Sequence, residues 1–184
     1  MRKISLVEQF LYVDTFPLKQ SLVNLEKVKF NAMLNYWGDH RQTNNENSFL
    51  YDYYNLTQDK NITWILDYVK DKHDLESKRN LINPQSRLLI QGKDESINYH
   101  NHIDEYDLIN SPSISGIYTI SCGENPVYFK VKYGAGRKQE FEHLIRLKEN
   151  QLIVFNSELF HCFTKNENKK HVINICFTFN YDSL

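Results

Sequence analysis

The sequence predicts a mainly β protein in which N-terminal helices precede a double-stranded β-helix, also called a jelly roll. Two observations support this fold class. Apolar side chains follow a helical spacing before about residue 85, and they form short strand-like segments after it. Turn-forming residues such as Gly92, Pro112 and Gly123 separate those segments. We therefore expect a single domain over residues 1–184, with a helical preface at 1–85 packed on a β core at 86–184.

Composition argues against several classes of partner. The chain has 184 residues, of which 41% are hydrophobic and 24% are charged, and this balance is typical of a globular domain. A net charge of -1 provides no overall attraction to nucleic acid, so nucleic acid is not an expected partner. No apolar stretch is long enough for a membrane span or a signal peptide. Three cysteines without a Cys-x-x-Cys pair favour reduced thiols, so we expect a cytoplasmic protein without membrane contact.

Two segments of the first half have the spacing of helix faces. One follows Pro17, and the other follows Asn61, a residue type that often caps helices. In the second segment, apolar residues occupy offsets 0, 3, 4 and 7 of one face: Ile62, Ile65, Leu66 and Val69. In the first, the spacing is looser: Leu22, Leu25, Val28 and Met33. Residues 11–15 predict a short strand before the first helix.

The second half predicts eight short strands. Their expected ranges are 87–91, 96–104, 115–121, 127–132, 143–147, 151–155, 160–164 and 172–179. Eight antiparallel strands arranged in two facing sheets form a jelly roll, which is the cupin-like architecture.

The second predicted strand carries three potential metal ligands. His100, His102 and Asp104 lie two residues apart in the segment Tyr-His-Asn-His-Ile-Asp. On a regular strand, alternation places all three side chains on one face. A buried face would be an expensive place for such groups without partners, whereas a solvated face is the ordinary setting of an isolated His-x-His.

His161 favours a metal site over a solvated face. It lies in the seventh predicted strand, and in an eight-stranded roll the second and seventh strands are neighbours in one sheet. Two histidines and one carboxylate that meet on one side of a metal form a facial triad, which suits Fe(II) and leaves positions open. The sequence thus predicts His102, Asp104 and His161 as ligands. The set of His100, His102 and His161 is the alternative.

Three sequence blocks resemble the Fe(II)/2-oxoglutarate-dependent dioxygenase superfamily, and the opening segment Leu-Tyr-Val-Asp-Thr-Phe-Pro at 11–17 resembles the strand and helix entry of its prolyl-hydroxylase-like members. The blocks are His102-Ile-Asp104, the segment Ser-Gly-Ile-Tyr-Thr-Ile at 115–120, and Leu-Ile-Val-Phe-Asn-Ser at 152–157, which is followed by His161. The last two are most similar to a bacterial and phage group of that superfamily. The resemblance covers roughly residues 87–180.

The resemblance implies Fe(II), 2-oxoglutarate as cosubstrate and O2. Members of the superfamily usually bind the far carboxylate of 2-oxoglutarate with an Arg or Lys on the last strand. Here Lys170 follows His161 at a suitable offset, and the hydroxyl of Thr119 could donate to the same carboxylate. If the register is shifted, Asn174 occupies this position, and its amide supplies no positive charge.

The implied activity is hydroxylation of a small-molecule, peptide or protein substrate, with a peptidyl or amino-acid side chain as the first expectation. Two alternatives stay open. One is a cupin-type metalloenzyme with three histidine ligands and no 2-oxoglutarate. The other is a non-catalytic jelly roll that serves as a binding or structural module, which the missing Arg would favour.

Overall fold

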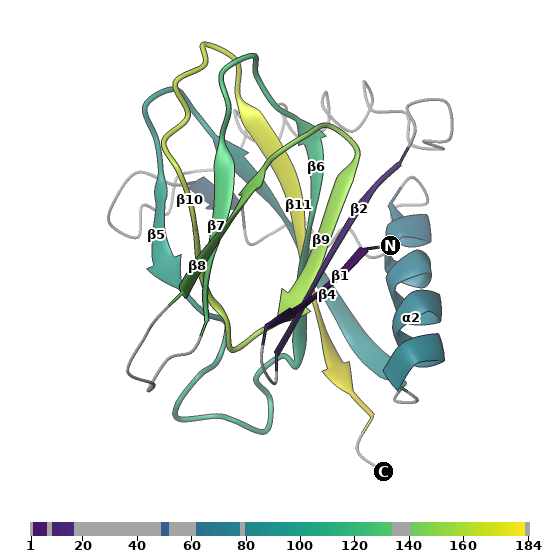
Figure 1. Ribbon diagram of the computed structural model, residues 1–184. Helices are drawn as coiled ribbons and strands as arrows, with labels where there is room; N and C mark the ends of the chain where they lie inside the picture. Colours follow the sequence, from purple (N-terminus) through teal and green to yellow (C-terminus); the bar gives the residue numbers. More distant parts are fainter. Residues whose placement is uncertain are drawn as a thin grey trace.

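The computed structural model describes residues 2–6, 9–16, 49–51, 62–77, 80–133 and 141–182. Within them, antiparallel strands form two sheets that face each other, and one helix lies on the outer side of the larger sheet (Figure 1). The predicted first helix at 22–33 and the proposed cap Asn61 lie outside the described residues.

In the part of the chain that the structure describes, the larger sheet contains seven strands. In spatial order they are β1 (Arg2–Leu6), β2 (Gln9–Thr15), β9 (Gln151–Asn156), β6 (Ile114–Ser121), β11 (Val172–Tyr181), β4 (Leu81–Gln91) and β3 (Phe49–Tyr51). The N-terminal part of the chain therefore contributes strands to this sheet, including the predicted strand at 11–15.

The smaller sheet contains four strands within the described ranges. In spatial order they are β5 (Ile97–His100), β10 (Phe160–Phe163), β7 (Tyr128–Tyr133) and β8 (Phe141–Arg146). The order β4, β11, β6, β9 in one sheet and β5, β10, β7, β8 in the other is that of a double-stranded β-helix, so the predicted fold class is confirmed. All eight predicted core strands are present. β4 begins earlier than expected, at Leu81, and β5 ends earlier, at His100.

Strand alternation divides the buried residues into two cores. Along β11, Ile173, Ile175 and Phe177 pack toward the helix α2 (Thr63–Ser77), whereas Val172 and Cys176 face the smaller sheet. The predicted helix face is buried in the first of these cores, as expected: Ile62, Ile65, Leu66 and Val69. The second core fills the space between the sheets, where the candidate site lies. Among the described residues, no helix is long and apolar enough to cross a membrane.

Candidate metal centre

Two histidines face each other across the ladder between β5 and β10. The Cα atoms of His100 and His161 are direct partners in this antiparallel pair, so strand pairing itself brings the side chains together. Their ring centroids are 4.3 Å apart. His161 is 2% exposed and packs against the rings of Phe129 and Phe155, which belong to the core between the sheets. His161, on the seventh core strand β10, therefore lies in the interior between the sheets.

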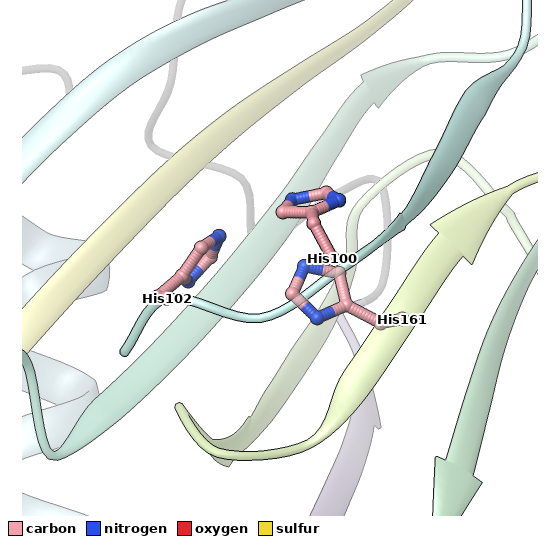
Figure 2. Close-up of side chains that lie close together, drawn as sticks. All are labelled: His100, His102 and His161. Carbon is pink, nitrogen blue, oxygen red and sulfur yellow. The ribbon is translucent and has the colours of Figure 1, made fainter. Parts of the chain in front are cut away.

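His102 joins this pair from the loop that follows β5. The backbone N–H of His102 donates to the carbonyl oxygen of Ser157, at 3.0 Å, which turns the chain away from the β5 ladder. Its ring centroid lies 4.8 Å from that of His161 and 5.3 Å from that of His100. The three rings form one group (Figure 2), with one ring nitrogen from each residue within 4.8 Å of the others.

Hydrogen bonds set the orientation of all three rings. The Nδ1 atoms of His100 and His161 lie 2.9 Å from the carbonyl oxygens of Asn98 and Leu159. A carbonyl oxygen only accepts, so both Nδ1 atoms carry the proton and both Nε2 atoms keep a lone pair. His102 Nδ1 lies 2.6 Å from Ser115 Oγ, a hydroxyl that can accept this bond. The arrangement leaves three Nε2 atoms as potential metal ligands.

Burial keeps these imidazoles neutral. It is the largest cause that lowers the pKa of His102 to about 3 and the pKa of His161 well below its usual value. Burial also lowers the pKa of His100. The positive charge of Arg87 contributes to the lower pKa of each of the three. A neutral imidazole is the form that binds a metal, so the group is ready to accept one without losing protons.

Asp104 lies apart from this group. Its side chain is exposed, and its Oδ1 accepts the backbone N–H of Tyr106 at 2.9 Å within the same loop. Its own N–H donates to Ser111 Oγ. The sequence placed Asp104 beside His102 by assuming a strand through residue 104, but the strand ends at His100. The structure therefore brings together His100, His102 and His161, the set that the sequence offered as the alternative.

Of the residues predicted to hold the cosubstrate, one is exposed and two are buried. Lys170 is exposed in the loop before β11, where its carbonyl oxygen accepts a hydrogen bond from Asn166. Thr119 and Asn174, in contrast, are fully buried and are direct partners across β6 and β11. Thr119 Oγ1 and both polar atoms of the Asn174 side chain have no hydrogen-bond partner among the described residues. Buried polar atoms without partners are costly, and a polar ligand between the sheets would satisfy them.

The sequence analysis assigned no functional role to three residues beside the centre. Ser115 orients His102, and Arg87 and Cys176 line a cavity of about 470 Å3 together with His102. Arg87 lies on β4 directly opposite Cys176 on β11. Arg87 is a charged residue at the start of the apolar segment Leu-Leu-Ile of β4, and this pattern could have marked it as a functional candidate. Its position relative to the histidines depends on which strands pair, and local sequence does not carry that information.

The residues of the centre fit a transition metal. Three neutral imidazoles suit Fe, Zn, Cu and Ni, and three protein ligands leave positions open for exogenous ones. Oxygen-bearing ligands would find unpartnered polar atoms at Thr119 and Asn174. The group can therefore hold a metal that also binds a small polar molecule.

No protein-family model matches the chain, and no curated protein matches it in sequence. Solved structures match over most of its length. A Pseudomonas putida prolyl-4-hydroxylase has a TM-score of 0.70 at 10% identity, with 94% of this chain and 93% of that chain covered. HygX from Streptomyces hygroscopicus, with nickel and 2-oxoglutarate bound, has a TM-score of 0.64 at 9% identity over 94% and 82%. A prolyl hydroxylase from Trichoplax adhaerens, in complex with a peptide fragment of the hypoxia inducible factor, has a TM-score of 0.60 at 9% identity over 92% and 83%.

Proposed function

We propose that this chain, whose fold is that of the 2-oxoglutarate-dependent oxygenases, is a metal-dependent oxygenase with a three-histidine centre. His100, His102 and His161 would hold Fe(II) through their Nε2 atoms. The observation that carries this proposal is the group of three inward-facing, neutral histidines between the two sheets. In this arrangement His102 takes the place of the carboxylate in a facial triad.

When bound, the iron together with 2-oxoglutarate and O2 would supply the oxidising chemistry. The chain's own residues position those groups. The backbone carbonyls of Asn98 and Leu159 and the hydroxyl of Ser115 fix the three rings. Between the sheets, Thr119 and Asn174 would donate hydrogen bonds to 2-oxoglutarate. Their buried and unpartnered polar atoms support this role.

The first substrate class is a peptidyl or amino-acid side chain. The loop that follows His102 presents three exposed apolar residues, namely Tyr106, Leu108 and Ile109. Such a surface would be expected beside a site that accepts a polypeptide. The structure with a bound peptide among the similar folds is consistent with this class. A small molecule that enters the cavity beside His102 is the second class.

A three-histidine metalloenzyme without 2-oxoglutarate is the second candidate function. It is favoured by the absence of Asp104 from the histidine group and by the exposure of Lys170. Without a ligand carboxylate and without a basic residue on the last strand, the site has two departures from the family pattern. The buried Thr119 and Asn174 pair supports the leading proposal over this one.

The proposal is tested by anaerobic titration with Fe(II) and then 2-oxoglutarate, followed by visible absorption. We expect a charge-transfer band that requires both additions in the wild-type protein and in the matched control Asp104→Ala. The band should disappear in His100→Ala, His102→Ala and His161→Ala. Loss of the band in Asp104→Ala with retention in His100→Ala would contradict the ligand set. Metal binding without any band would favour the second candidate function.

A further inference from the structure

The far carboxylate of 2-oxoglutarate needs a positive charge that the last strand does not provide. β11 contains no Lys or Arg, and Lys170 is exposed in the loop before it. Asn174 faces the interior from β11, but its amide is neutral. A carboxylate held only by Thr119 and Asn174 would lose its hydration without gaining an ion-pair partner.

Arg87 brings a positive charge to the interior from the neighbouring strand. On β4 it shares a face with Leu89, which belongs to the core between the sheets, whereas Leu88 packs toward α2. Arg87 is the cross-strand partner of Cys176, and Leu89 is the partner of Asn174. The side chain of Arg87 therefore lies on the same face of the larger sheet as the Thr119 and Asn174 pair. Its strand, β4, is the direct neighbour of β11, which carries Asn174.

Arg87 also shares a cavity with one of the three histidines, His102. It lines the cavity of about 470 Å3 together with His102, Cys176 and Thr178. The positive charge of Arg87 therefore lies in the same cavity as one ligand of the proposed metal centre.

We propose that Arg87 binds the far carboxylate of 2-oxoglutarate, in place of a basic residue on the last strand. This inference rests on the proposed function. The planar guanidinium can donate two parallel hydrogen bonds to a carboxylate, and Thr119 and Asn174 would complete the contacts with neutral donors. A three-histidine centre also keeps the full charge of its metal. A doubly negative cosubstrate would therefore meet two positive groups, the metal at its keto acid end and Arg87 at its far carboxylate.

The test is a binding measurement that needs no turnover. Isothermal titration calorimetry of the anaerobic, Fe(II)-loaded protein would compare 2-oxoglutarate with 2-oxopentanoate, which keeps the keto acid but lacks the far carboxylate. We expect the wild type to prefer 2-oxoglutarate by about 10- to 100-fold, the range of a hydrogen-bonded charge. In Arg87→Gln this preference should disappear, with 2-oxopentanoate binding unchanged. Arg87→Lys should retain part of it.

Lys170→Gln is the matched control, because it removes a positive charge at the position that the sequence suggested. The preference should be unchanged in this variant. Retention of the preference in Arg87→Gln, or its loss in Lys170→Gln, would overturn the inference while the metal centre stands. Equal loss of both ligands in Arg87→Gln and Arg87→Lys would also overturn it. If the wild-type metal centre binds neither keto acid, the proposed function fails, and the inference fails with it.

Discussion

The three histidines of the centre are held by two different kinds of acceptor. His100 and His161 use backbone carbonyls, which no side-chain substitution removes. His102 uses the hydroxyl of Ser115, which in turn lies 2.7 Å from the hydroxyl of Ser157. The orientation of His102 therefore depends on a side chain that can be replaced, and its contribution to metal binding can be measured.

Ser115→Ala should weaken metal binding by about 10- to 100-fold, because hydrogen-bond partners of ligand histidines typically contribute this much to affinity. Competition with a chelator for Zn(II) measures the change. The matched control is Ser157→Ala, which removes the outer hydroxyl but leaves the bond between His102 and Ser115. A smaller effect is expected there. Equal affinities in wild type and Ser115→Ala would show that Ser115 does not position His102.

The sequence identified the three histidines, but it predicted that β5 extends to residue 104, whereas the strand ends at His100. The alternation argument for His102 and Asp104 required a strand through residue 104. The chain instead leaves the ladder after His100, because the N–H of His102 bonds to Ser157, which is 55 residues away in sequence. Arg87 was missed for a similar reason. Its neighbours are set by the pairing of the first and last core strands, which a local pattern does not encode.

At the scale of elements, β6 explains one of the sequence blocks in physical terms. Ser115 and Thr119 face the interior. Ser115 forms a hydrogen bond with His102, and Thr119 is the cross-strand partner of Asn174. Between them, Gly116 lies opposite Phe177 on β11. A Cβ at residue 116 would overlap the Phe177 ring, which is buried in the core beneath α2. The Gly in this block is therefore required by close packing across the sheet.

Gly116→Ala should lower the free energy of unfolding by about 1–3 kcal/mol, the usual cost of overpacking a dense core. Urea denaturation measures this change. The double variant Gly116→Ala with Phe177→Leu should be less destabilised than the sum of the two single variants, because the smaller side chain makes room for the methyl group. Strict additivity would contradict the proposed contact.

The elements themselves were largely predictable, because turn residues bound short apolar segments. β9 is buried on both faces, so its Leu-Ile-Val-Phe segment at 152–155 was recognisable as an apolar run without alternation. The start of β4 was missed because Asn83 and Pro84 indicate a turn. The structure continues the strand through them, with a positive φ at Asn83 and a register shift in the β4–β11 ladder between Thr178 and Asn180.

At the scale of the whole molecule, buried neutral histidines make the metal-free protein sensitive to acid. In the unfolded chain these side chains recover a pKa near 6.5. In the folded chain, burial lowers the pKa of His102 to about 3 and the pKa of His161 well below 6.5. Below pH 6.5 the unfolded state therefore binds protons that the folded state does not bind. The free energy of unfolding should fall as the pH falls through this window.

Each such histidine should contribute a slope of about 1.4 kcal/mol per pH unit between about pH 6 and pH 4. Urea unfolding of the metal-free protein at several pH values measures the total slope. His161→Gln should reduce it by about one histidine's share, because the glutamine does not titrate. His143 is only half-buried, in contrast to the buried His161, so His143→Gln serves as the control. Identical slopes in wild type and His161→Gln would contradict the account.

The most direct test of the three-histidine centre is anomalous X-ray diffraction from crystals loaded with Fe(II) under anaerobic conditions. We predict a single strong anomalous peak about 2 Å from the Nε2 atoms of His100, His102 and His161, the distance of a metal–imidazole bond. The carboxylate of Asp104 should lie outside the coordination sphere. A peak coordinated by Asp104 in place of His100, or no peak between β5 and β10, would contradict the central claim.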